Sequence, residues 1–169
     1  MLVQPAHAKW KKFCSPECRR AAQQQRWIVH LRKTDAAWLA GFTDGEGSIR
    51  FSFSSTKGRR YFTPAITIAN TQEKIIDEIL KMIGFGYKRI GKSIKPNWNT
   101  PYWCSFTGWQ AMAVIKNIYP YLRLKKAQAD LLIEFPHCSH KPDNATRAKQ
   151  AGLFERMKAL NYRGRKRLF

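Results

Sequence analysis

Two acidic residues follow a stripe of small residues in the first third of the chain. Ala37, Gly41 and Gly45 are four residues apart, which in a helix puts them on one side and lets a second helix approach closely. Asp44 and Glu46 come where that helix should end. The helix dipole disfavours a carboxylate there, so such acids favour a neutralising cation or proton. Oxygen ligands beside a basic surface suit Mg²⁺ bridging to a phosphate. A glycine-rich turn with solvated acids explains the same residues equally well.

A short helix and a strand should position these acids. Residues 36–42 are apolar and follow the capping-type pair Thr34-Asp35, which predicts a helix that Gly45 and Gly47 end. Residues 49–54 then alternate apolar and polar side chains, as a half-buried strand does. The pattern puts Arg50, Ser52 and Ser54 on one face. The opposite, apolar face is predicted to be Ile49, Phe51 and Phe53.

The rest of the chain continues the alternation of helices and strands. A basic turn over residues 57–60 leads into a second strand ending at Asn70, which makes a hairpin. The remaining expected elements are a helix over 71–83, strands over 87–94 and 102–107 around a turn at 95–97, a helix over 109–119, and two later helices, the last over 145–160. The predicted core order is therefore helix, two strands, helix, two strands, helix.

Charge narrows the range of partners. The 169 residues contain 31 Lys and Arg against 11 acids, a formal net charge of +20, and 44% are hydrophobic. That composition excludes general disorder, and no apolar stretch is long enough for a membrane helix. Such a positive field points to a polyanion, above all nucleic acid. An anionic membrane surface is disfavoured because no strongly apolar helix face accompanies a basic one.

The amino-terminal segment differs in composition from the rest of the chain. Residues 1–33 form a basic arm, and residues 34–169 are expected to form one domain with a basic C-terminal tail. The arm has no continuous apolar core like that of a signal peptide, so we expect an intracellular protein, in the cytoplasm or nucleoid or in an organelle matrix. The four cysteines are expected to be free thiols or part of a metal site rather than disulfides.

The segment from Leu39 to Gly47, LAGFTDGEG, resembles the nine-residue motif of the LAGLIDADG homing endonucleases. The resemblance extends over roughly residues 34–167, because the family's αββαββα order fits the expected elements. It implies an α+β fold whose antiparallel sheet forms a saddle in the DNA major groove, with further helices at the C-terminus. One motif per chain implies a homodimer in which the motif helices pack together. The interface residues would be Ala37, Trp38, Gly41, Phe42 and Gly45.

The resemblance also implies roles for individual residues. Glu46 would bind Mg²⁺, or another divalent cation, through its carboxylate, and Gly45 through its backbone carbonyl. Gln72 matches the position that orients solvent near the nucleophile, and Lys125 matches the basic position that stabilises charge at the reacting phosphate. Asp44 would support the helix end. A second basic residue, common in the family on the helix after Gln72, has no clear match, although Lys74 could substitute.

The alternating strands supply candidate DNA contacts. Arg side chains can pair bidentately with guanine edges, while basic residues at turns suit phosphates. The expected base-facing residues are Arg50, Ser52, Ser54, Thr63, Thr67 and Arg89, and the expected backbone contacts are Lys57, Arg59, Arg60, Lys92, Lys95, Arg163 and Lys166. Any single one of these charges could instead be an ordinary solvated surface residue.

A second metal site is a weaker hypothesis. Cys14 and Cys18 resemble half of a small zinc ribbon, and His7 and His30 could complete four ligands at irregular spacing. A degenerate arm without zinc is the alternative interpretation. His137, Cys138 and His140 could bind metal by composition, but no further ligands lie nearby in sequence, which favours ordinary loop residues.

The implied activity is metal-assisted hydrolysis of both strands of a long, specific DNA target, leaving short 3′ overhangs. The main alternative is a non-catalytic DNA-binding regulator or an intron RNA maturase on the same fold, which the fold alone does not exclude. A general RNA-binding basic protein is a further alternative, with salt-sensitive and sequence-indifferent affinity. The joint presence of Glu46, Gln72 and Lys125 favours the nuclease, because a binder has no need of them.

Overall fold

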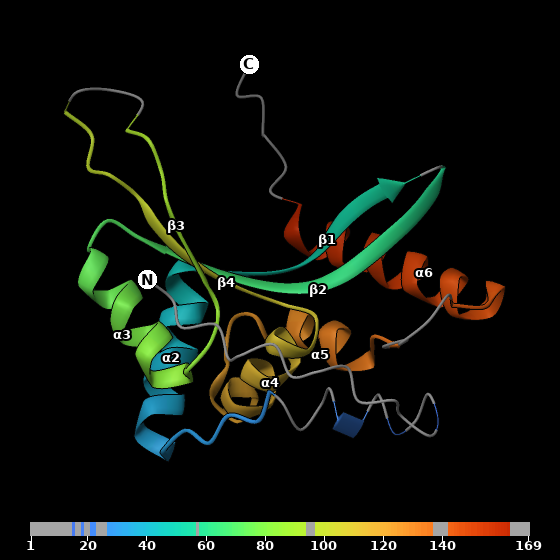
Figure 1. Ribbon diagram of the computed structural model, residues 1–169, viewed down its shortest axis with the longest axis horizontal. Coiled ribbons are helices and arrows are strands. Elements are labelled where there is room, and N and C mark those ends of the chain that lie inside the picture. The colour runs from blue at the N-terminus through green and yellow to red at the C-terminus, as the bar shows by residue number, and fades with distance from the viewer. Residues whose placement is uncertain are drawn as a thin grey trace.

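Four strands form one antiparallel sheet, and helices cover one of its faces in the computed structural model (Figure 1). The structure describes residues 27–56, 58–93, 97–136 and 142–162, together with residues 15, 18, 21 and 22. The strands are β1 (Gly47–Thr56), β2 (Arg59–Asn70), β3 (Tyr87–Ile90) and β4 (Tyr102–Thr107), in the spatial order β1-β2-β4-β3. The helices are α2 (Lys33–Glu46), α3 (Glu73–Ile83), α4 (Trp109–Ile118), the short 3₁₀ turn η1 (Tyr119–Tyr121), α5 (Lys126–Glu134) and α6 (Asn144–Asn161).

The predicted αββαββα order is confirmed, with α5 and α6 following it along the chain. In Figure 1 the β1–β2 hairpin and the strands β3 and β4 rise at opposite ends of the molecule, so the uncovered face of the sheet is concave. None of the described helices is both long and apolar enough to cross a membrane.

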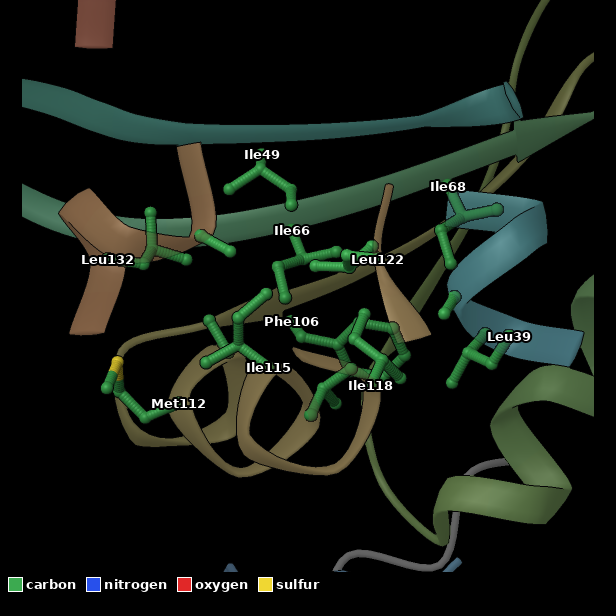
Figure 2. Packing of buried hydrophobic residues seen from close by; sticks show 14 of the residues in the cluster. Leu39, Ile49, Ile66, Ile68, Phe106, Met112, Ile115, Ile118, Leu122 and Leu132 are labelled. Carbon is green, nitrogen blue, oxygen red and sulfur yellow. The ribbon is translucent and has the colours of Figure 1, made fainter. Parts of the chain in front are cut away.

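The core lies between the sheet and the helices. Ile49 of β1 pairs with Ile66 of β2, and Ile66 pairs with Phe106 of β4, so these three side chains leave the sheet on the same face. All three are buried on the helical side of the sheet, where Ile66 and Phe106 lie over Ile115 and Ile118 of α4 (Figure 2). Each such side chain contributes roughly 1.5–3 kcal/mol relative to an exposed position. The expected apolar face of β1 is confirmed for the buried Ile49 and Phe51. Phe53, nearer the hairpin turn, is 52% exposed because only neighbouring rings such as Phe62 and Phe154 cover it in part.

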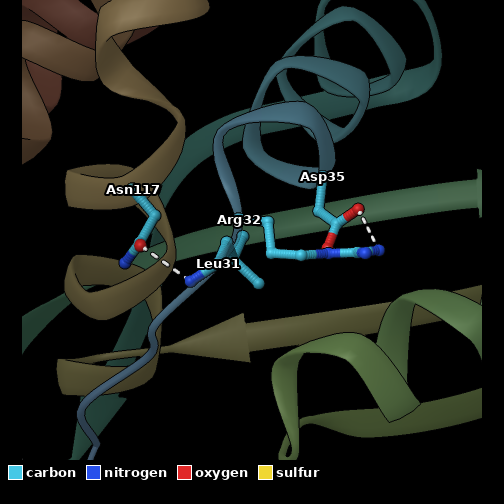
Figure 3. A network of polar contacts seen from close by, with 4 residues as sticks. All are labelled: Leu31, Arg32, Asp35 and Asn117. Carbon is cyan, nitrogen blue, oxygen red and sulfur yellow. Dashed lines mark hydrogen bonds and ion pairs between the residues drawn. The ribbon is translucent and has the colours of Figure 1, made fainter.

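The ends of two elements differ from the sequence-based prediction. Helix α2 begins at Lys33, and Asp35 does not cap it; Asp35 accepts a hydrogen bond of 2.8 Å from Arg32 Nε instead (Figure 3). The helix also continues through Gly45 to Glu46, because a glycine costs a helix only about 1 kcal/mol and the other side of α2 is buried. Strand β3 ends at Ile90 rather than at residue 94.

Part of the amino-terminal segment packs on the helical face. Val29 is buried in the core. Asn117 of α4 holds the backbone on both sides of His30, since its Nδ2 donates to the Val29 carbonyl at 3.0 Å and its Oδ1 accepts from Leu31 N at 3.4 Å. Figure 3 shows the bond to Leu31. Trp27 meets Phe85 edge-on, with ring centroids 5.0 Å apart. The division between arm and domain near residue 34 stays a prediction, with Val29 already packed in the core.

Helix α2 passes into β1 without a linker, and Gly47 is the residue at the junction. Its backbone is in the extended region, and its N–H donates to the Thr43 carbonyl. A Cβ on Gly47 would lie 2.6 Å from that carbonyl oxygen and 2.8 Å from Thr43 Cα. Both are backbone atoms of a buried residue, so neither can move aside easily. Glycine is required here by close approach.

We expect Gly47→Ala to lower the free energy of unfolding by about 1–3 kcal/mol, because overpacking forces the helix end and the strand apart. Gly152→Ala is the matched control: it lies inside α6 with nothing near its Cβ position, and should be neutral or stabilising by about 0.5–1 kcal/mol. Chemical denaturation of both variants measures the difference. Equal stability of the two variants would contradict the packing argument.

Candidate active site and nucleic-acid interface

The two acids at the end of α2 face different surroundings. Asp44 is only 9% exposed, whereas Gly45 and Glu46 are exposed. Within the described residues, the Glu46 carboxylate makes no ion pair. One acid is therefore turned into the protein, and the other is presented at the surface where α2 meets the sheet.

Three successive backbone N–H groups converge on the Asp44 carboxylate. Asp44 Oδ2 accepts from Arg123 N at 2.7 Å and from Leu124 N at 3.2 Å, and Oδ1 accepts from Lys125 N at 2.9 Å. These donors lie at the N-terminal end of α5, where the helix dipole favours a negative charge. The carboxylate thus joins the end of α2 to the beginning of α5.

Lys125 completes the junction from the other side. Its Nζ donates to the Thr43 carbonyl at 3.1 Å and also to the Asp44 carbonyl. The ammonium group therefore lies at the carboxyl end of α2, where the helix dipole favours a positive charge. The structure thereby brings Lys125 to the end of the motif helix, with Glu46 two residues beyond Asp44.

The environment of Asp44 changes its pKa. Burial acts to raise the pKa, but the three backbone N–H groups and the Lys125 ammonium outweigh it and hold the pKa of Asp44 below its ordinary value. The ionised carboxylate is therefore the form that the fold stabilises.

Because the pKa of Asp44 is lower in the folded than in the unfolded chain, its stabilisation is present above the ordinary value near 3.9 and is lost as pH falls through the folded-state pKa. At about pH 7 we expect Asp44→Asn to be less stable than the wild-type chain by about 1–3 kcal/mol. That difference should shrink as the pH is lowered from about 5 toward 2. Thermal unfolding across this range measures it, and a difference independent of pH would refute the assignment.

Gln72 lies at the same end of the sheet as Glu46. Gly47 pairs with Ile68, and Gln72 follows β2 as the residue preceding α3. Its backbone N–H donates to Asn70 Oδ1 at 2.8 Å, which fixes the turn, and its side chain is exposed. No hydrogen bond joins the Gln72 and Glu46 side chains in the described part of the chain. Lys74 is also exposed, in the first turn of α3.

The open face of the sheet carries a groove above β1, β2, β4 and β3. Its lining includes Arg50, Ser52, Thr67 and Arg89, four of the residues that the strand pattern predicted to face DNA. Ser52 pairs with Thr63, and Ser54 pairs with Tyr61, so Thr63 and Ser54 share this face. The predicted face is therefore present, while contact of these residues with DNA stays a prediction.

Other groove residues were not predicted from the sequence. Besides Ala65, they are Tyr87, Trp103, Ser105, Thr107 and Gln110. The register β2–β4 and β3–β4 explains this, because Thr67 pairs with Ser105, which also pairs with Tyr87. Alternation within residues 102–107 could have indicated Trp103, Ser105 and Thr107, once the buried face of that strand had been assigned.

The remaining predicted contacts lie away from the groove floor. Arg59 and Arg60 are exposed at the start of β2, and Lys92 is exposed after β3. Lys57, Lys95, Arg163 and Lys166 lie outside the described residues.

The donor atoms at the end of α2 suit a hard divalent cation. A surface carboxylate and a neighbouring backbone carbonyl are oxygen ligands of the kind that Mg²⁺ and Ca²⁺ take. Among the described residues, however, no three His, Cys, Asp or Glu side chains gather into a metal site. Glu46 and Gly45 fit part of such a coordination shell, and one chain does not complete it.

The zinc hypothesis gains no support. Cys18 and His30 are both exposed. Cys14 and His7 lie outside the described residues, as do His137, Cys138 and His140.

The stripe of small residues on α2 is uncovered. Ala37, Gly41 and Gly45 are exposed, and nothing lies near the Cβ positions of the two glycines. Beside the stripe, Trp38 is 41% exposed and stacks on the half-buried Phe42 at 5.3 Å between ring centroids. These are the five residues predicted for a dimer interface, and among the described residues they form an apolar surface with no covering element.

Solved structures share this architecture. The homing endonuclease I-CvuI, in complex with the I-CreI target in the presence of Mg, aligns with a TM-score of 0.66 and 27% identity over 80% of this chain and 86% of that one. The archaeal intron-encoded I-Vdi141I, complexed with DNA, aligns with a TM-score of 0.60 and 16% identity over 80% and 89% of the two chains. The fold is therefore that of the homing endonucleases.

Sequence similarity points the same way. DNA endonuclease I-CvuI of Chlorella vulgaris is 30% identical over 103 residues, which are 58% of this chain and 61% of that protein. No protein-family model matches the chain. The chain thus spans about three fifths of the length of this relative, and its motif, fold and sequence are similar to those of the homing endonucleases.

Proposed function

We propose that this chain is a site-specific homing endonuclease that makes a metal-dependent double-strand break in a long DNA target. The observation that carries the proposal is the Lys125 ammonium bound at the carboxyl end of α2, the same helix end that carries the exposed Glu46. The net charge of +20 supports a DNA substrate, since phosphate neutralisation dominates the affinity of such proteins.

The residues at the helix end support hydrolysis of a phosphodiester. Glu46 and the Gly45 carbonyl would hold Mg²⁺, which supplies Lewis-acid chemistry at the phosphate. Lys125 stabilises negative charge that develops there, and Gln72 orients the attacking water. Because cleavage is expected across the minor groove, the products would carry short 3′ overhangs.

The groove supports recognition of a duplex. Arg50 and Arg89 can donate bidentately to guanine edges, while the shorter Ser and Thr side chains beside them suit contacts bridged by water. Arg59, Arg60 and Lys92 lie at the ends of strands, where phosphate contacts would set the register on the DNA.

The active form that we propose is a homodimer joined through the α2 stripe. One chain supplies a single Glu46, and two strands must be cut, so a second copy packed on Ala37, Gly41 and Gly45 would bring two acids together. This arrangement also covers Trp38 and Phe42.

We expect Gly41→Leu to convert the dimer into monomers, because a large side chain fits in open space on one chain but keeps two α2 helices apart. Gly152→Leu adds the same side chain at an open position on α6 and should leave the dimer intact. Sedimentation of the two variants and the wild-type chain distinguishes them. A dimer that tolerates Gly41→Leu would place the interface elsewhere.

Cleavage of a randomised duplex library tests the function directly. With Mg²⁺ we expect cuts in one sequence class, with short 3′ overhangs. Glu46→Gln should lower the cleavage rate by a factor on the order of 10³ or more while leaving DNA binding in place, because it removes a ligand charge without changing shape. Omission of the divalent cation should do the same.

The other outcomes identify the alternatives. Retention of one duplex sequence without cutting would favour a regulator or maturase. Affinity for any nucleic acid that falls steeply with salt and ignores sequence would indicate a general RNA-binding protein.

A further inference from the structure

Asp44 is the most completely bonded acid in the described part of the chain, and the nuclease function proposed above does not use it. Its two carboxylate oxygens accept three backbone N–H groups from residues 79 to 81 positions further along the chain. The side chain is only 9% exposed, so it cannot meet a ligand at the surface as Glu46 can. A carboxylate saturated in this way holds other groups in place.

We propose that Asp44 is a positioning residue that fixes Lys125 at the reactive end of α2. The inference rests on the proposed function, because it assigns Lys125 a task at the phosphate. Asp44 itself touches neither the substrate nor the metal. It acts through the backbone of residues 123–125, and its effect on the reaction is the placement of one ammonium group.

The bonding is reciprocal. Asp44 holds the Lys125 backbone N–H at 2.9 Å, and the Lys125 ammonium donates back to the carbonyls of Thr43 and Asp44. Lys125 is therefore tied to the same helix end through both its backbone N–H and its side-chain ammonium. A surface lysine otherwise samples many rotamers, so two anchors remove most of that freedom before the substrate arrives.

The turn that leads to Lys125 is tied to its neighbouring elements at its two ends, where Leu122 N–H donates to the Tyr119 carbonyl and the Lys125 carbonyl accepts from Ala129 N–H. Residues 122–125 lie between η1 and α5 and belong to no helix or strand. Leu122 is buried, but Arg123 is exposed and Leu124 is 77% exposed, so side-chain packing fixes only the start of this turn. The Asp44 carboxylate binds the N–H groups of the remaining three residues.

Asp44→Asn is expected to disrupt the hydrogen bond from the Lys125 backbone N–H and to keep the other two. The amide oxygen can take the place of Oδ2 and keep Arg123 and Leu124, but the amide nitrogen then faces the Lys125 N–H, donor against donor. We expect the Lys125 backbone to move away. A displacement of about 1 Å is enough to lower a rate on the order of a hundredfold.

The experiment uses the full-length chain and the duplex recovered from the library. Asp44→Asn should lower the single-turnover cleavage rate on the order of tenfold to a hundredfold, while affinity for the same duplex without divalent cation stays within about twofold. Asp35→Asn is the matched control: it removes one charge from the same helix, at the end that carries the Arg32 pair, and should leave both quantities unchanged.

A double-mutant cycle separates positioning from a general structural role. Lys125→Met removes the ammonium but keeps the backbone N–H, so Asp44→Asn should still lower stability in that background. It should lower the cleavage rate no further, because the group that it positions is already gone. Additive rate losses would overturn the proposal.

Amide hydrogen exchange on the wild-type chain tests the geometry if Asp44→Asn does not fold. The N–H groups of residues 123–125 should exchange slowly although their turn lies at the surface, and rapid exchange there would overturn the proposal. A wild-type chain that cuts no duplex refutes the proposed function instead. A wild-type chain that cuts, with Asp44→Asn equal to Asp35→Asn, refutes only the role of Asp44.

Discussion

The direct passage from α2 into β1 is the constraint on which the site depends. Gly47 caps α2 and is the first residue of β1, and its backbone lies so close to Thr43 that no side chain fits between them. Because no linker intervenes, the orientation of the helix end relative to the sheet is fixed to within the freedom of one residue. Glu46 is consequently held at the edge of the polar face, and the first outward-facing strand residues come directly after it.

The helical periodicity explains why Asp44 and Glu46, two residues apart, have different surroundings. Successive residues turn by about 100° around a helix, so Asp44 and Glu46 point in nearly opposite directions. One direction leads inward to the N–H groups before α5, and the other leads out to solvent. Burial of Asp44 is tolerable only because three donors and an ammonium compensate for its lost hydration. The Asp44 charge is therefore held by hydrogen bonds, and the Glu46 charge is exposed to solvent.

The spacing of residues along the sequence predicts which side of a single helix or strand is exposed. The alternation in residues 49–54 identified the polar face of β1, and the small residues of α2 identified its uncovered side. The sequence could not show that Asp44 meets residues 123–125, because that contact joins segments about 80 residues apart and depends on the whole core. The sequence could not place Trp103 and Tyr87 in the groove for the same reason, because their positions depend on a strand register that only the assembled sheet defines. No periodic pattern around Val29 indicated that this residue is buried in the core.

The composition of the open face bears on what it can recognise. A protein that stacks unpaired bases needs aromatic rings exposed along a path, whereas the groove here is mostly Ser, Thr and Arg with aromatics only toward β3 and β4. Short hydroxyl side chains reach the edges of stacked base pairs only when the sheet itself enters the groove of the duplex, and the concave sheet of Figure 1 is shaped to do so. The same face brings cations together in a chain already at +20, which costs the free protein electrostatic self-repulsion. Phosphates of the proposed DNA target would relieve that repulsion, so binding and stability would be coupled through one interaction, and both should depend on salt.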